Sequence, residues 1–285
     1  LKINRFHSIL ARVITEVSST RLVVICNLGV CSRVKILCSV AFYLPGYRSG
    51  GPVRTIANMV DHLGGGFEFR IVTKDRDALD TEPYSDVVVD EWNQVGYAEV
   101  FYASPSIQTF AGWRQVLRAT EYDLLYLNSF FSDRFTILLL LLRRFRLIPD
   151  RPTILAPRGE FSAGALELKA PKKRAFLRVA KGLGLYRGLI WQASSEFEKA
   201  DIERVMGGVA GKIVVAPDLA PKIEIGMGDE DLIIEREPGP LRIVFLSRIS
   251  PKKNLEFALE VIREMEQEEV FDIYGGISDK KYWER

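Results

Sequence analysis

An alternation of two patterns, running from Val34 to Ala216, constrains the fold of this chain more than any other feature. Short apolar runs rich in β-branched residues alternate with longer stretches whose apolar residues recur at helical spacing. This order is typical of an α/β fold with a mostly parallel, doubly wound sheet. We expect strands at residues 34–43, 67–73, 86–90, 98–102, 123–128, 152–156, 189–192 and 212–216. We expect helices at residues 52–63, 106–120 and 196–206, a leucine-rich helix capped by Ser132, and a basic helix within residues 169–187.

The composition excludes several classes of protein. The chain has 285 residues, of which 47% are hydrophobic, so it can form two domains with a buried core. Its 39 basic and 37 acidic residues leave a net charge of +2, which argues against a general nucleic-acid binder. His7 and His62 are the two histidines, so a His-rich metal site is nearly excluded. No apolar run in the sequence has the length of a membrane span.

Residues 1–33 precede the first strand pattern, and we interpret them as an extension or as translated sequence upstream of the true start. The apolar part at residues 22–31 could belong to a signal peptide, but Val30 fits poorly before a lipoprotein-type Cys31. The spacing of Cys26, Cys31 and Cys38 matches neither a zinc ribbon nor a redox pair. The sequence therefore favours reduced thiols in a cytosolic protein.

Two loops follow predicted strands and are candidates for ligand binding. The first contains Gly50, Gly51 and Pro52, where glycine lets backbone amides approach a ligand and Pro52 suits the first turn of a helix. Its glycine spacing is neither a dinucleotide fingerprint nor a P-loop, and a plain tight turn is the alternative. The second loop leaves the strand that ends at Ala156 and contains Arg158 and Glu160. An ordinary crossover with a surface ion pair is the alternative there.

The helix after the second loop is strongly basic. Its cations are interleaved with apolar residues, and no acidic residue lies among them. This pattern fits an anionic lipid surface or a phosphorylated acceptor, with a solvated amphipathic face as the alternative. The cations that we single out are Lys172, Lys173, Arg174 and Arg178.

Residues 218–240 lose periodicity and gain Pro, Gly and acidic residues, which indicates a linker between a domain at 34–217 and a second unit at 241–285. The second unit opens with an apolar strand, breaks at Pro251, and resumes as a helix over residues 254–267, followed by a strand at 270–274. Arg248, Lys252 and Lys253 lie in the strand-to-helix turn, where α/β sheets bind anions. A solvated basic turn is the alternative.

Taken together, this order of elements and these motifs resemble the GT-B fold of family-4 glycosyltransferases. The resemblance covers about residues 34–283 and rests on short motifs in both units. In the second unit, Arg248 follows Ser247, and Lys253 stands five residues later in a Pro-Lys-Lys-Asn sequence whose Asn254 replaces the family's usual Gly. In the first unit, the matching motifs are Gly50-Gly51-Pro52, Ala156-Pro157-Arg158-Gly159, Gly164-Ala165-Leu166 and Ser195-Glu196, the second and third of which resemble a branch that builds surface polysaccharides.

The resemblance implies transfer of a sugar, with retention at the anomeric carbon, from a nucleotide-diphosphate donor to a polysaccharide or lipid-linked acceptor. It implies that Arg248 and Lys253 stabilise the departing diphosphate without a metal or cofactor. Gly50, Gly51 and Pro52 would face the donor phosphates or the acceptor. Asn128, Arg158 and Glu160 would lie on the acceptor side, with Asn128 standing where the family often carries His.

The family's later Glu-x7-Glu element would fall beyond Arg285, so we expect a complete first Rossmann-like domain, only the first β-α-β of the second, and impaired donor binding. An alternative function is a non-catalytic module whose basic helix holds an anionic lipid or a partner enzyme. A Rossmann oxidoreductase is disfavoured because no Gly-x-Gly-x-x-Gly follows a strand. We expect a cytoplasmic protein that binds no nucleic acid, and leave open peripheral contact with the inner face of the cytoplasmic membrane.

Overall fold

The computed structural model describes residues 33–167, 170–222, 239–265 and 269–285. The chain divides into two compact units, with the boundary between residues 223 and 224. All but the last residue of the expected extension 1–33 lies outside the described residues, as do 223–238 of the expected linker, Lys169 and the end of the expected helix 254–267.

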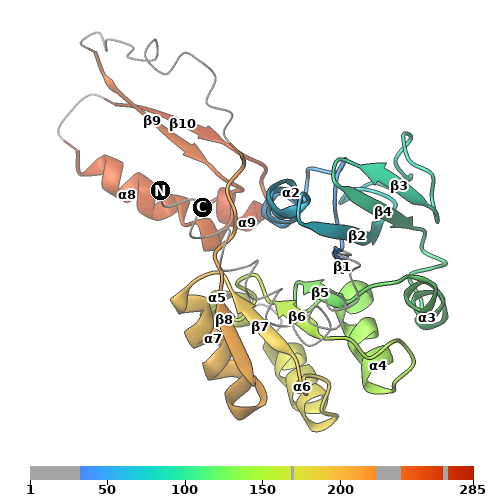
Figure 1. Cartoon of the computed structure of the whole chain (residues 1–285). Helices are drawn as coiled ribbons and strands as arrows, with labels where there is room; N and C mark the ends of the chain where they lie inside the picture. The colour runs from blue at the N-terminus through green and yellow to red at the C-terminus, as the bar shows by residue number, and fades with distance from the viewer. Residues whose placement is uncertain (1–32, 168–169, 223–238, 266–268) are drawn as a thin grey trace. The chain divides into compact units, whose positions relative to one another are not determined.

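The first unit contains an eight-stranded sheet in the order β3-β4-β2-β1-β5-β6-β7-β8. All neighbouring strands run parallel except β3, which is antiparallel to β4 (Figure 1). The prediction of a mostly parallel α/β sheet is therefore confirmed. The strands are β1 (Val34–Ser39), β2 (Phe67–Lys74), β3 (Trp92–Val95), β4 (Ala98–Ala103), β5 (Leu124–Asn128), β6 (Thr153–Ala156), β7 (Ile190–Ala193) and β8 (Lys212–Val215).

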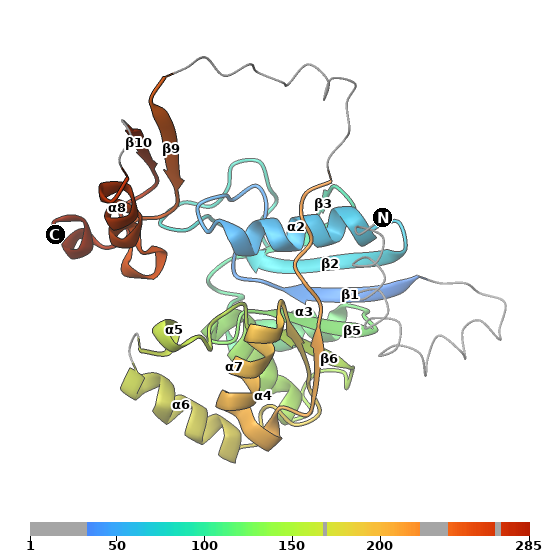
Figure 2. The ribbon, with the colours of Figure 1, turned by 90° about the vertical axis from the view of Figure 1, so that its left-hand side faces the viewer.

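Helices cover both faces of this sheet (Figure 2). One face packs against α2 (Gly51–Leu63), whose Ile56, Met59 and Val60 are buried with the strands. The opposite face contributes to a second core cluster, which also takes residues from several helices. These helices are α3 (Phe110–Ala119), α4 (Leu138–Arg144), α6 (Ala170–Gly182) and α7 (Glu196–Met206). The short α5 (Ala163–Glu167) and the 3-10 turn η2 (Gly207–Val209) lie in connections.

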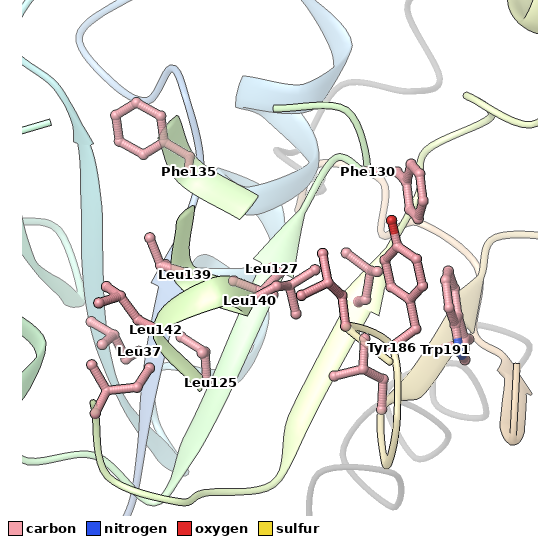
Figure 3. Packing of buried hydrophobic residues seen from close by; sticks show 14 of the residues in the cluster. Leu37, Leu125, Leu127, Phe130, Phe135, Leu139, Leu140, Leu142, Tyr186 and Trp191 are labelled. Atoms are coloured by element: carbon pink, nitrogen blue, oxygen red, sulfur yellow. The ribbon is translucent and has the colours of Figure 1, made fainter. Parts of the chain in front are cut away.

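The second core is built around the leucine-rich helix, as the sequence predicts. Ser132 caps a π-helical turn, η1 (Asp133–Ile137), by accepting a hydrogen bond from the N–H of Phe135, and α4 follows directly. Figure 3 shows Leu139, Leu140 and Leu142 packed beside leucines of β1 and β5. At the other end of the cluster, Phe130 stacks on Tyr186 and Trp191, with ring centroids 5.1 Å and 6.1 Å apart. Burial of this apolar surface stabilises the unit that positions the loops at the sheet edge.

Three predictions of secondary structure are wrong in the first unit. The strand expected at residues 34–43 ends at Ser39. The expected strand at residues 86–90 is a series of turns, because Val88 exchanges hydrogen bonds with the side chain of Asn93 and Asp90 has a φ of 60°. The edge strand is instead β3, which the sequence reading missed. The expected helix 106–120 begins only at Phe110, because Thr109 caps it by accepting from the N–H of Gly112.

The second unit contains two parallel strands, β9 (Leu241–Leu246) and β10 (Glu269–Tyr274). Between them lie a 3-10 turn, η3 (Pro251–Lys253), and helix α8 (Leu255–Arg263), and α9 (Lys280–Trp283) follows β10. The expected strands and the helix between them are thus present in the described residues. Val244 and Leu246 remain 58% and 80% exposed, so one face of this small sheet has little cover.

Candidate functional site

The first candidate site lies where the strand order reverses. The chain places β2 on one side of β1 and β5 on the other, so β1 and β5 form a topological switch point. Ligands of open α/β sheets bind beyond the carboxyl ends of strands at such a point. Gly50 and Gly51 lie in the connection after β1, Asn128 ends β5, and Arg158 follows β6. The predicted residues of the first unit therefore lie at the carboxyl ends of neighbouring strands or in the loops that follow these ends.

Gly50 precedes α2 and Gly51 is its first residue, so no side chain covers the backbone at the start of this helix. Gly50 has a φ of 64° and a ψ of −124°, a conformation that favours glycine, and no atom lies within 4 Å of a Cβ added at either glycine. Pro52 stands in the first turn, and no side chain caps the helix. A residue from another loop fixes the connection between β1 and α2, because Asp77 accepts hydrogen bonds from the N–H groups of Tyr47 and Arg48 at 2.8 and 3.1 Å.

Arg158 is the centre of a polar network beneath this edge. Its Nε donates to Oδ1 of Asn128 at 2.7 Å, and one terminal nitrogen donates to the hydroxyl of Tyr126 at 2.6 Å. The other terminal nitrogen pairs with Asp218. Tyr126 in turn donates to Gln192 at 2.8 Å. The structure thus brings together Asn128 and Arg158, which the sequence reading placed in one site, and fixes both through contacts within the protein.

Burial and neighbouring groups act in opposite directions on Arg158. Burial alone would lower the pKa of its guanidinium, but the acidic groups around it, Tyr126 and Asp218 foremost, outweigh that effect and raise the pKa. Burial also raises the pKa of the Cys38 thiol to about 12, although the charge of Arg158 opposes this rise. At neutral pH the site therefore contains a fixed cation and a protonated thiol, which is a poor nucleophile.

Glu160 orders a neighbouring loop. Its carboxylate accepts hydrogen bonds from Ser129 Oγ at 2.8 Å and from the N–H groups of Phe130 and Phe131 at 2.5 and 2.9 Å. These contacts fix the loop after β5, where Ser129 has a φ of 89°. The predicted contact of Glu160 with an acceptor stays a prediction, because the protein itself engages both carboxylate oxygens here.

Glu198 has the same role at the next strand of the sheet, and the sequence reading missed it. Its carboxylate accepts from the N–H of Gly159 at 2.6 Å and from both the N–H and the hydroxyl of Ser194, at 2.7 and 2.6 Å. Of the two serines that could cap α7, Ser194 and Ser195, it is Ser195 that does so, by accepting from the N–H of Glu198. The loops after β6 and β7 are therefore joined through one buried carboxylate.

Residues after β8 complete the site from the other side. The hydroxyl of Thr55 in α2 donates to Oδ2 of Asp218 at 3.4 Å. Asn58 donates to the carbonyl of Leu219 at 2.7 Å, so this segment runs along α2. The sequence reading assigned Asp218 to the linker. The polar network itself could have been suspected from Tyr126 and Gln192. Both are polar residues inside buried strands, and such residues require hydrogen-bond partners.

The second candidate site lies in the second unit and contains Arg248 and Lys253. Both side chains are exposed, and neither forms a hydrogen bond or ion pair with any residue that the structure describes. Ile249, which is 3% exposed, anchors the turn by pairing with Ile277, and its N–H donates to the carbonyl of Gly276. The cations therefore extend from a fixed turn at the carboxyl end of β9.

Asn254 is the residue at which the second unit differs from the motif that its sequence resembles. Its φ of 54° and ψ of 48° place it in the left-handed region between η3 and α8. Glycine adopts this conformation freely, and asparagine is among the few other residues that tolerate it. Asn254 can thus take the position of the usual Gly without loss of the turn.

The basic helix contributes a third group of predicted residues, at a distance in sequence from the other two. Lys172, Arg174 and Arg178 are exposed on α6. Lys173 differs from them, because its ammonium donates to the carbonyl of Ala165 at 2.5 Å.

No protein-family model and no curated protein matches this chain. Within the described residues, no cluster of three or more His, Cys, Asp or Glu side chains could hold a metal ion. None of the helices in the described portion of the chain combines the length and apolar content that a membrane span requires.

Proposed function

We propose that this chain belongs to a sugar-transferring enzyme of the GT-B type, similar to family-4 glycosyltransferases. The reaction would move a sugar from a nucleotide-diphosphate donor to a saccharide or lipid-linked acceptor. The observation that supports this most directly is the pair of cations Arg248 and Lys253. They lie at the carboxyl end of a parallel strand, directly before a helix, with no partner among the described residues.

The chemistry of transfer explains why such cations are needed. A bond forms between the acceptor oxygen and the anomeric carbon while the bond from that carbon to the diphosphate breaks. The departing diphosphate gains negative charge, which Arg248 and Lys253 would stabilise together with the N-terminal end of α8. Groups of this kind contribute about 2–4 kcal/mol each to transition-state stabilisation. No metal is needed in this scheme.

The first unit would bind the acceptor. The uncapped start of α2 offers the backbone N–H of Gly51, since that of Gly50 donates to the carbonyl of Tyr47. Asn128 and Arg158 lie below the same sheet edge. The Arg158 network keeps these loops in place before a substrate arrives, which reduces the ordering that binding requires. Retention of configuration, the polysaccharide or lipid-linked nature of the acceptor, and a cytoplasmic location belong to the same proposal.

Binding of nucleoside diphosphates to the chain tests the donor half of the proposal. We expect uridine or guanosine diphosphate to bind by calorimetry, and Arg248→Ala and Lys253→Ala each to weaken binding by about tenfold or more. Arg242→Ala is the matched control, because Arg242 is exposed in the same unit but pairs with Asp272. Equal affinity in all three variants, or no binding of any nucleoside diphosphate, would contradict the proposal that Arg248 and Lys253 bind the diphosphate of the donor.

A further inference from the structure

Helix α6 presents a surface whose charge has one sign. Its 13 residues contain five cations and no acidic side chain. Figures 1 and 2 show the helix on the outside of the first unit, and Ala180 is its one buried residue. Most of the helix surface is therefore available to something outside this unit.

The structure separates the cations of α6 into two groups, which the sequence alone could not do. Lys173 donates to the carbonyl of Ala165 and lies over the ring of Phe131, 4.8 Å from its centroid. Lys181 donates to the carbonyl of Val205 at 2.5 Å. These two ammonium groups hold the helix in place. Lys172, Arg174 and Arg178 are exposed and form no hydrogen bond or ion pair with the residues that the structure describes.

Apolar side chains are also exposed on this helix and directly after it. Val179 and Leu183 are 60% and 48% exposed. The end of α4 adds a further aromatic residue, because Arg144 donates to the carbonyl of Leu183 at 2.9 Å and is followed by Phe145, which is 59% exposed. Residues nearly forty positions apart in sequence thus form one surface of mixed character.

We propose that this surface docks on a lipid bilayer that carries anionic headgroups. The surface consists of Lys172, Arg174, Arg178 and Val179 of α6, with Leu183 directly after the helix and Phe145 beside its end. Cations attract the headgroups, and the exposed apolar side chains enter the boundary between headgroups and acyl chains. A nucleic acid would satisfy the charges but would leave Val179, Leu183 and Phe145 without an apolar environment. This inference is independent of the proposed sugar transfer, since none of its residues belongs to either candidate site.

Vesicle flotation with the full chain tests the proposal. We expect binding to vesicles of phosphatidylcholine mixed with phosphatidylglycerol, and none to phosphatidylcholine alone. A cation near such a surface contributes roughly a fivefold gain in affinity, so Arg174→Gln combined with Arg178→Gln should weaken binding by about 25-fold. Val179→Ser combined with Leu183→Ser should also weaken binding, whereas a purely electrostatic contact would not respond.

The chain offers a matched control on another helix. Arg114 and Arg118 have the same spacing on α3, are exposed, and have no hydrogen bond or ion pair with described residues. Their double replacement by Gln removes the same charge and should leave binding unchanged. Equal loss with both arginine pairs would overturn the proposal, as would failure to bind anionic vesicles. Binding of duplex RNA in place of vesicles would overturn it too.

Discussion

Asp218 pairs with Arg158 although 60 positions separate them in the sequence. The guanidinium is nearly buried, with a side-chain exposure of 10%, whereas the carboxylate is 40% exposed. The same carboxylate lies beside Thr55 of α2. One ion pair thereby ties the loop after β6 to the segment after β8 and to the first turns of α2, and so holds together three segments of the candidate acceptor site.

Loss of Arg158 should destabilise the first unit far more than loss of Asp218. Arg158→Ala leaves the buried oxygens of Asn128 and Tyr126 without their donor, which costs roughly 3 kcal/mol of unfolding free energy. Asp218→Asn should cost less than about 1 kcal/mol, because water reaches that side chain. Urea unfolding followed by tryptophan fluorescence measures both. Equal losses of unfolding free energy in the two variants would show that the ion pair with Asp218, and not the bonds to Asn128 and Tyr126, accounts for the contribution of Arg158.

The sequence predicted those features of the fold that depend on local patterns. Ser132 caps the helical segment predicted to follow it, and the position of Pro52 near the start of α2 is confirmed. The strand predicted at residues 86–90 failed because Val88 bonds to the side chain of Asn93, a preference that apolar content does not reveal.

The polar network was only partly predictable. Arg158 was recognised because its loop leaves the carboxyl end of a strand. Asn128 was named only through the resemblance, as the residue that stands where family-4 glycosyltransferases often carry His. The roles of Glu160 and Glu198 depend on which loops become neighbours, and that is fixed by the order of strands β5, β6 and β7 in the sheet. Asp218 was hidden for a similar reason, since its partner lies in a loop distant in sequence and its own segment reads as a linker.

The first unit should lose stability in acid partly through Asp77. Burial raises the pKa of this carboxyl, but hydrogen bonds from the backbone N–H groups of Arg48, Tyr47 and Ala78 outweigh burial, so the pKa lies below its ordinary value. Since the unfolded pKa is about 3.9, the stabilisation by Asp77 is full above that pH and disappears as the pH falls through the folded pKa. The difference in unfolding free energy between the protein and Asp77→Asn should therefore shrink below about pH 4. A difference that is constant with pH would contradict this account.

The effect of a substitution at Asn254 on the stability of the turn should depend on how readily the new residue adopts the left-handed backbone conformation. Asn254→Gly should preserve the turn, because glycine adopts this conformation without steric penalty. Asn254→Ala should destabilise the turn by about 1 kcal/mol, since alanine keeps the unfavourable Cβ but lacks the short polar side chain that lets asparagine tolerate this region. Hydrogen exchange of the first turn of α8, measured by mass spectrometry on the full chain, reports the effect. Faster exchange with Gly than with Ala would contradict the account that the left-handed backbone conformation decides which residues this turn accepts.

Gly275 should be required for the turn that carries Arg248. A Cβ at this position would lie 1.8 Å from the carbonyl oxygen of Ser247, so Gly275→Ala must displace the backbone directly before Arg248. Gly276→Ala is the matched control, because no atom lies within 4 Å of its added Cβ. We expect Gly275→Ala to speed hydrogen exchange at Ser247 and Ile249, whose N–H groups donate to the carbonyls of Tyr274 and Gly276. It should also weaken binding of nucleoside diphosphates. Equal effects of the two variants would mean that the second unit does not depend on this close contact to position its cation.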